Sequence, residues 1–171
     1  MANVYLLCGA PGVGKSYWAQ HHIKPGAAYI SRDTIRFSLL KEGEDYFSHE
    51  NEVYQIMWDQ INGALSDGRD VIVDQTSLNP KSRKYLIDHL TGYKTLNAIW
   101  IDTPLEVALE RNELRQDLAR VPRKDIYRMY QRFIAPSFEE GFDRIFRYKN
   151  NKMTMKKRKK GDINDTKDKK Y

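Results

Sequence analysis

The sequence predicts an α/β fold built on a central parallel sheet of about five strands flanked by helices. Short apolar runs alternate along the 171 residues with longer stretches of helical periodicity, a rhythm typical of parallel sheets. The glycine-rich stretch "GAPGVGKS" directly follows the first apolar run. Because ligands bind at the carboxyl ends of parallel strands, this position suits a phosphate-binding loop.

Five apolar runs are the candidate strands. In chain order they cover residues 3–8, 27–31, 70–74, 96–102 and 144–148. The first and third contain the continuous runs "VYLLC" and "VIV", as expected of strands that are buried on both faces. We therefore expect helices on both sides of the sheet.

Helical patterns lie between these strands. One follows the glycine-rich stretch over residues 15–22. A longer one covers residues 50–66, where Val53, Met57 and Ile61 recur at the spacing of one helix face. This face is predicted to pack on the sheet.

Charge divides the chain into a domain, residues 1–150, and a basic tail, residues 151–171. Nine of the 29 basic residues and three of the 23 acidic residues fall within 152–171, so the rest of the chain holds 20 of each. The net charge of +6 therefore belongs to the tail and does not indicate a basic face on the domain. We expect the tail to be solvated and disordered, with a nucleic-acid-tethering arm as the alternative.

The single cysteine, Cys8, excludes an internal disulfide framework and fits a reducing compartment. Because no basic residue adjoins Cys8 in the sequence, we expect a buried small side chain rather than a nucleophile. No apolar run approaches the roughly 20 residues of a membrane helix, and the start lacks the basic region of a cleaved signal. The expected location is the cytoplasm.

The glycine-rich stretch matches the phosphate-loop pattern G-x-x-x-x-G-K-[ST]. Glycines let backbone N–H groups turn toward phosphate oxygens, while Lys15 adds charge near the β- and γ-phosphates and the Ser16 hydroxyl can ligate Mg²⁺. The positive end of the following helix faces the same anion. The predicted nucleotide-binding residues of this loop are Gly9, Gly12, Val13, Gly14, Lys15 and Ser16.

Two carboxylates fall at the ends of candidate strands. Asp33 follows the second strand in "SRDTIR", and Asp74 closes the third. On a helix Asp33 and Arg36 would share a face, which suits accepting a proton from a substrate hydroxyl beside an anion. The alternative is that Asp33 only caps the helix and Arg36 is its surface partner. Asp74 is expected to orient Mg²⁺-bound water or a neighbouring basic group.

The stretch "DQTSLNP" follows the third strand. Thr76 and Asn79 add hydrogen-bonding groups at the same edge of the sheet. For Asn79 a capping role is favoured, because the following Pro80 fits the first position of a helix.

Several arginines follow the fourth strand. Arg111 and Arg115 are four residues apart and would share a helix face. Arg120 and Arg123 lie in a turn near Pro122. Arginines on a lid can stabilise the charge of a transferred phosphoryl group. The alternative is a solvated amphipathic helix in which they alternate with glutamates.

Together, "GAPGVGKS", "SRDTIR", "DQTSLNP", "ERNELR" and "VPRKDIYRMYQRF" resemble the kinase domain of 5′-polynucleotide kinases, those of phages above all. The likeness covers about residues 3–143. The resemblance implies a P-loop kinase fold with a small helical lid, ATP as phosphoryl donor, Mg²⁺ as cofactor, and the 5′ ends of DNA or RNA as partners. A phage-encoded protein would work in the host cytoplasm.

On the acceptor side, the resemblance implies that Asp33 is the general base on a 5′-hydroxyl. Arg36 would hold the phosphate next to that hydroxyl, and Asp74 and Thr76 would contribute to substrate binding.

On the donor side, the resemblance implies that Lys15 and Arg115 stabilise the transferred phosphoryl group, with Arg111 in support. Ser16 would ligate Mg²⁺, and Asp74 would contact the ion through water.

Three function classes remain open from the residues alone. The favoured class transfers the γ-phosphoryl group of ATP to a polynucleotide 5′-hydroxyl. A kinase of the same fold could instead use another hydroxyl, on a nucleoside, a hydroxymethylated DNA base or a small metabolite, and the near-neutral domain fits this class mildly. The third class is a non-enzymatic nucleotide-binding module or a motor, against which the candidate base Asp33 argues. The sequence leaves the oligomeric state open.

Overall fold

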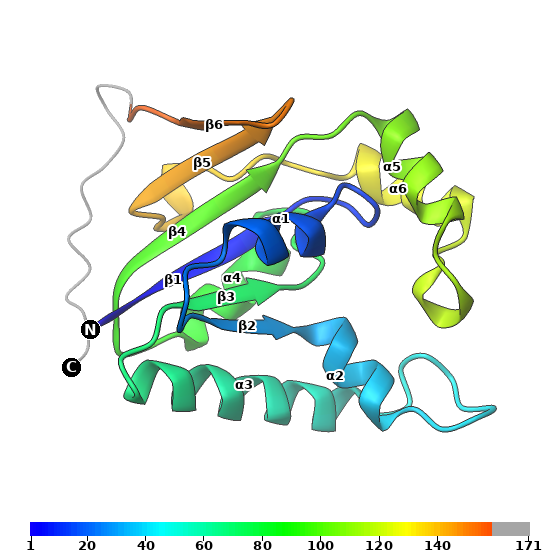
Figure 1. The fold of residues 1–171 in the computed structure, drawn as a ribbon, viewed down its shortest axis with the longest axis horizontal. Helices are drawn as coiled ribbons and strands as arrows, with labels where there is room; N and C mark the ends of the chain where they lie inside the picture. Colours follow the sequence, from blue (N-terminus) through cyan, green and yellow to red (C-terminus); the bar gives the residue numbers. More distant parts are fainter. Residues whose placement is uncertain (159–171) are drawn as a thin grey trace.

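A six-stranded sheet with the strand order β2-β3-β1-β4-β5-β6 forms the centre of the computed structural model, which describes residues 1–158 (Figure 1). The first five strands are parallel to their neighbours and the sixth is antiparallel. The parallel α/β fold predicted from the sequence is therefore confirmed. The strands are β1 (Ala2–Cys8), β2 (Ala28–Ser31), β3 (Val71–Asp74), β4 (Tyr93–Ile101), β5 (Arg144–Lys149) and β6 (Lys152–Met155).

Helices lie on both faces of the sheet and beyond its carboxyl end (Figure 1). They are α1 (Lys15–His22), α2 (Arg32–Leu39), α3 (Glu50–Ser66), α4 (Pro80–His89), α5 (Leu105–Glu113) and α6 (Arg123–Gln131), with 3₁₀ turns at Asp117–Ala119 and Phe138–Glu140. Within residues 1–158, no helix combines the length and apolar character that crossing a membrane requires. The pair α5 and α6 stands at the carboxyl end of the sheet as a small lid.

Side chains of the central strands are buried on both faces. Leu6 of β1 belongs to the core with Met57 of α3, whereas Leu7 points to the opposite face and joins the core with Trp18 of α1. Cys8 lies in the first of these cores, where burial raises the pKa of its thiol to about 12, so it is an apolar core side chain as predicted.

The residues that cap the N-termini of α4 and α2 test two predictions. Asn79 caps α4 as predicted, since its side chain accepts a hydrogen bond from the Ser82 backbone N–H at 3.0 Å. The cap of α2 is Ser31, whose hydroxyl accepts from the Thr34 backbone N–H at 3.3 Å. Asp33 therefore lies inside the first turn of α2, and the alternative that it only caps the helix is wrong.

Strand β6 corrects the predicted boundary of the tail. Residues 152–155, expected to stay unpacked, pair with β5 through a hairpin at Asn150 and Asn151. Both asparagines have positive φ angles, 49° and 57°, which suit the tight turn of a β-hairpin. All four β6 side chains are exposed, so backbone pairing rather than apolar burial holds the strand. The rest of the predicted tail, from residue 159 on, lies outside the described residues.

Candidate active site

The glycine-rich loop joins β1 to α1 and packs against α5. Gly12 and Gly14 have φ angles of 82° and 103°, which L side chains rarely adopt. A Cβ atom on Gly12 would lie 2.3 Å from the carbonyl oxygen of Ala108, and one on Gly14 would lie 2.9 Å from Nη1 of Arg111. The carbonyl of Val13 accepts a hydrogen bond from that same nitrogen at 2.9 Å. Glycine is therefore required where the loop touches α5.

Lys15 begins α1 and reaches back across the loop. Its Nζ donates hydrogen bonds to the carbonyl oxygens of Gly9 and Ala10, each at 3.1 Å. Burial lowers the pKa of Lys15, and the negative charge of Asp74 opposes that shift. The ammonium group thus stands inside the loop, at the place where the pattern predicted charge for phosphates.

Ser16 and Asp74 lie together, as the sequence predicted for a metal site. The Ser16 hydroxyl donates to Asp74 Oδ2 at 2.9 Å, and the Tyr29 hydroxyl donates to the same oxygen at 2.6 Å. Burial, followed by the charge of Asp74, raises the pKa of Tyr29, so Tyr29 remains a donor. The hydrogen bond between Ser16 and Asp74 joins residues that are 58 positions apart, and so it connects the loop to the end of β3.

The donor atoms at Ser16 and Asp74 fit a magnesium ion. A hydroxyl and a carboxylate are the oxygen ligands that Mg²⁺ prefers. Within residues 1–158, no group of three or more His, Cys, Asp and Glu side chains could hold a metal. Phosphate oxygens and water would therefore supply the remaining ligands, which is usual for Mg²⁺ in nucleotide sites.

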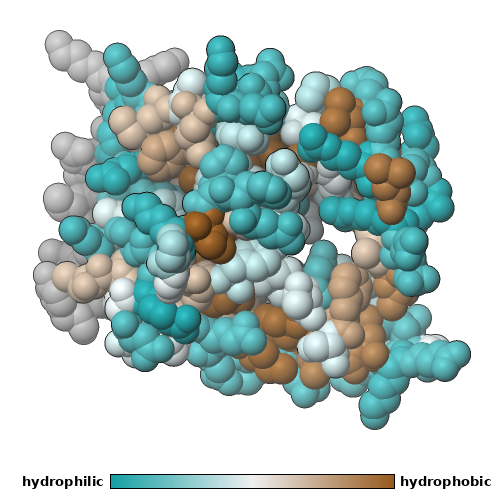
Figure 2. Space-filling view, in the orientation of Figure 1, coloured by the Kyte–Doolittle hydropathy of each residue, from teal (hydrophilic) through white to brown (hydrophobic). Residues whose placement is uncertain are grey.

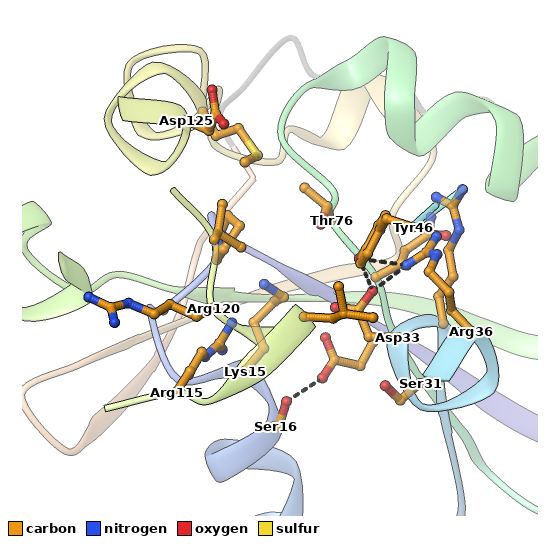
Figure 3. A pocket seen from close by; sticks show the side chains of 18 of the residues that line it. Lys15, Ser16, Ser31, Asp33, Arg36, Tyr46, Thr76, Arg115, Arg120 and Asp125 are labelled. Atoms are coloured by element: carbon orange, nitrogen blue, oxygen red, sulfur yellow. Dashed lines mark hydrogen bonds and ion pairs between the residues drawn. The ribbon is translucent and has the colours of Figure 1, made fainter. Parts of the chain in front are cut away.

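Asp33 and Arg36 meet on the first turns of α2. Arg36 Nη1 donates to Asp33 Oδ1, and the hydroxyl of Tyr46, from the loop before α3, donates to the same oxygen at 2.7 Å (Figure 3). The Asp33 side chain is 53% exposed and lines the cavity described below. The predicted pairing of this carboxylate with this arginine is therefore present in the structure.

Arg36 is buried rather than exposed. Its residue surface is 3% accessible, and Nε and Nη2 both face Glu50 Oε1 at 2.7 Å. Burial alone would lower the pKa of Arg36, but its hydrogen bond to the Glu50 carboxylate raises that pKa above its usual value. Tyr46 lies against the guanidinium, with Cζ 4.3 Å from the ring centroid, and Phe47 lies 5.7 Å away. The alternative that Arg36 is a surface partner is thus wrong.

The lid arginines do not share a helix face, so that prediction is wrong. α5 ends at Glu113, and Arg115 lies beyond it. Arg111 remains in the helix and donates to the glycine-rich loop at Val13. Arg115 lines the cavity, and its Nη1 lies 3.4 Å from the carbonyl oxygen of Ala119 (Figure 3). One arginine thus braces the loop, and the other faces the site.

The lid is packed onto the domain. Ala108, Leu109 and Asn112 of α5 are buried, and the Asn112 amide holds the backbone of Val121 through bonds of 2.7 and 3.0 Å. α5 is therefore amphipathic, as the alternative expected: one face is buried, and Arg111 alternates with the exposed glutamates Glu106, Glu110 and Glu113. Arg120, one of the two arginines near the turn, pairs with Glu113 at the rim.

A cavity of about 600 Å³ opens between the loop, the start of α2 and the lid. Figure 2 shows the hollow between the lid on the right and the body of the molecule. Among the predicted site residues, its walls contain Gly12, Lys15, Ser16, Asp33, Arg36, Asp74, Thr76 and Arg115. The other four are not among the lining residues: Gly9, Val13, Gly14 and Arg111.

Three cavity or support residues were missed by sequence reasoning. Tyr46 and Phe47 line the cavity, and Glu50 holds Arg36. The aromatic pair in the polar stretch "KEGEDYFSHE" was the available signal, because an exposed aromatic pair in a charged loop is typical of a binding surface. Glu50 gave no such signal, since acidic residues are common in a first helical turn.

The chain is similar in sequence to a known domain family and to two viral proteins. A family model described as an AAA domain matches residues 4–136. A putative bifunctional polynucleotide phosphatase/kinase of Acanthamoeba polyphaga mimivirus is 30% identical over 153 residues, which cover 84% of this chain and 32% of that protein. A putative bifunctional polynucleotide kinase/RNA ligase of Autographa californica nuclear polyhedrosis virus is 29% identical over 150 residues, 77% of this chain and 21% of that protein. The chain thus spans between a fifth and a third of these relatives.

Solved structures share the fold at lower identity. A chain of the Pnkp1/Rnl/Hen1 RNA repair complex matches with a TM-score of 0.66 at 22% identity, covering 77% of this chain and 43% of that one. A putative kinase of Chloroflexus aurantiacus matches with a TM-score of 0.59 at 14% identity, covering 77% and 76%. The P-loop kinase fold and the resemblance seen in the sequence are therefore confirmed.

Proposed function

The chain belongs to the AAA domain family, and from this premise we propose that it transfers the γ-phosphoryl group of ATP to the 5′-hydroxyl of a DNA or RNA end. The comparisons support the broader statement, a nucleotide-binding phosphotransferase of the P-loop kinase class. The names of the viral relatives support the polynucleotide acceptor.

The observation that carries the proposal is a cavity with two chemically different sides. Lys15, Ser16 and Asp74 line one side, where the loop would hold the donor phosphates. Asp33 and Arg36 line the other, with a carboxylate open to a hydroxyl and a fixed positive charge beside it. A binding module or a motor needs no such acceptor side.

On the donor side, loop N–H groups and the Lys15 ammonium bind the β- and γ-phosphates. Ser16 and Asp74 would hold Mg²⁺, which would neutralise part of the negative charge of the donor phosphates. Arg115 faces the same space from the lid and stabilises the negative charge of the transferred group. Arg111 acts behind the loop, by holding the Val13 carbonyl.

On the acceptor side, Asp33 accepts the proton of the 5′-hydroxyl as that oxygen attacks the γ-phosphorus. The new O–P bond forms while the bond from the γ-phosphorus to its bridging oxygen breaks, so the products are ADP and a 5′-phosphate end. Arg36 attracts the phosphate next to the hydroxyl, and Glu50 and Tyr46 keep its guanidinium in place.

Phe47 supports an acceptor that carries a nucleobase. Its side chain is 67% exposed, lines the cavity and stands 5.7 Å from the Arg36 guanidinium carbon. An exposed aromatic ring offers a stacking surface for a base, and each such contact contributes about 1–3 kcal/mol. A ligand that places a phosphate at Arg36 and a base at Phe47 would be the terminal nucleotide of a DNA or RNA strand. Thr76, also exposed at the cavity, adds a hydrogen-bonding group.

The test offers several acceptors to the protein with Mg²⁺ and γ-labelled ATP. We expect label on DNA or RNA oligonucleotides with a 5′-hydroxyl and none on matched oligonucleotides with a 5′-phosphate. Label only on nucleosides or small metabolites, or on hydroxymethylated bases of 5′-phosphorylated DNA, would reject the polynucleotide 5′ end and favour the other acceptor class. The predicted cytoplasmic location stays a separate prediction.

A further inference from the structure

Tyr46 lies in the loop between α2 and α3 and bonds to both acceptor-side residues (Figure 3). Its hydroxyl donates to Asp33 Oδ1 at 2.7 Å and accepts from Arg36 Nη1 at 2.7 Å. Its ring lies against the same guanidinium, with Arg36 Cζ 4.3 Å from the ring centroid, and packs edge-on to Phe47 with centroids 4.8 Å apart. Both the ring and the hydroxyl are therefore held in one orientation.

Asp33 receives both of its side-chain hydrogen bonds on the same oxygen. Arg36 Nη1 and the Tyr46 hydroxyl bind Oδ1, whereas Oδ2 has no hydrogen-bond partner among residues 1–158. Because the side chain is 53% exposed and lines the cavity, Oδ2 is the oxygen available to an incoming hydroxyl. The two oxygens of this carboxylate are thus chemically distinct before any substrate binds.

We propose that Tyr46 is a positioning residue whose hydroxyl fixes Asp33 so that Oδ2 takes the proton from the acceptor. The inference rests on the proposed function, in which Asp33 is the general base. Two donors on Oδ1 prevent the carboxylate from rotating, and correct orientation of a reacting group is worth a large part of the rate of such a step.

The electrostatics around Tyr46 agree with this role. Burial and then the hydrogen bond to Asp33 raise the pKa of Tyr46 to about 12, with Arg36 and Arg32 opposing the shift, so the hydroxyl stays a donor at neutral pH. The charges of Arg36 in α2 and of Lys15 at the start of α1 both interact with the charge of Asp33. Because the Tyr46 hydroxyl is neutral, removing it takes no charge away from this group.

The variant Tyr46→Phe tests the inference, because it keeps the ring on Arg36 and removes only the hydroxyl. We expect kcat to fall about 10-fold or more, with the acceptor KM changed by less than about two-fold. A residue with a purely structural role would not lower kcat while leaving the acceptor KM unchanged.

A double-mutant cycle shows whether Tyr46 acts through Asp33. In the Asp33→Asn background, the Tyr46→Phe change should alter the residual kcat by less than about two-fold. The control Tyr85→Phe changes a half-exposed tyrosine of α4, whose ring contacts Tyr54 and His89, and should behave as wild type. An unchanged kcat in Tyr46→Phe, or an undiminished loss in the Asp33→Asn background, would overturn the inference.

The wild-type protein separates this inference from the proposed function. If the wild type labels no oligonucleotide but labels another hydroxyl, the polynucleotide acceptor is wrong, and the same Tyr46→Phe comparison is made with that hydroxyl. If it labels no acceptor at all, both the function and the role of Tyr46 are rejected.

Discussion

Glu50→Gln tests whether the buried Arg36 depends on a carboxylate partner. Glu50 is the first residue of α3. Its Oε1 lies 2.7 Å from both Nε and Nη2 of Arg36, and its other carboxylate oxygen pairs with Arg32. The amide of glutamine keeps the shape and one oxygen acceptor but loses the charge. Arg36, at 3% accessibility, would then keep Asp33 as its remaining acidic partner.

The magnitude follows from these contacts. A hydrogen bond to a charged group contributes about 1.5–3 kcal/mol, and breaking a buried ion pair completely costs about 3–5 kcal/mol. Because the Glu50 side chain is 23% exposed and glutamine still accepts a bond, we expect a loss of about 2 kcal/mol in the free energy of unfolding. For a domain of this size that corresponds to a melting temperature lower by about 4–8 °C.

The assay is thermal and urea unfolding of both proteins as a function of pH. Burial opposes ionisation of Glu50, but its bonds with Arg36 and Arg32 hold its pKa below the usual value. A depressed pKa gives stability that is present above the unfolded-state value, about 4.3, and is lost as the pH falls through the folded-state value. The difference in the free energy of unfolding between wild type and Glu50→Gln should therefore be largest at pH 7 and should shrink at strongly acidic pH.

Glu52→Gln is the matched control, two positions along the same helix. Its side chain is 57% exposed and lies 3.6 Å from His49, so the change should cost less than about 0.5 kcal/mol. Equal melting temperatures for wild type and Glu50→Gln would refute the reasoning, because Arg36 would then not need this carboxylate.

Three further predictions concern the loop, the acceptor side and the hairpin. Gly14→Ala places a Cβ 2.9 Å from Arg111 Nη1 at a φ of 103°, so calorimetry should show ATP affinity at least about 10-fold weaker, and unchanged affinity would contradict the loop geometry. Phe47→Ala should raise the oligonucleotide KM about 10-fold and leave the ATP KM unchanged, whereas an unchanged oligonucleotide KM would remove the stacking role. Asn151→Gly, at a φ of 57°, should raise the free energy of unfolding by about 0.5 kcal/mol in urea melts, and destabilisation would argue against the tight turn.

The sequence predicted the parts of the molecule that depend on local pattern. The five parallel strands, the face of α3 that carries Met57 and the cap at Asn79 all follow from short-range spacing, and all are present. The hairpin to β6 was missed because its strand is only four residues long, and its two apolar side chains, Met153 and Met155, adjoin a lysine-rich run. Two asparagines also took the place of the usual glycine turn.

The candidate site was predictable in its residue types but not in its contacts. Asp33 and Arg36 meet as their spacing predicted, yet nothing local showed that Glu50 and Tyr46 would bury the arginine. Likewise, α5 ends before Arg115, and no glycine or proline marks that end in the sequence. The four-residue spacing of Arg111 and Arg115 therefore predicted a shared helix face that is not present. Such features arise from tertiary packing, which short-range patterns do not encode.

Phosphoryl transfer by Asp33→Asn shows whether Asp33 is the general base of the acceptor side. Asparagine keeps the shape of the side chain but cannot accept the proton, and loss of a general base typically costs about 10²- to 10⁴-fold. We expect the variant to bind ATP with wild-type affinity, as measured by calorimetry, and to lose at least about 100-fold in labelling of 5′-hydroxyl oligonucleotides. Transfer at close to the wild-type rate would contradict this expectation, because the acceptor side of the cavity would then contain no base at Asp33.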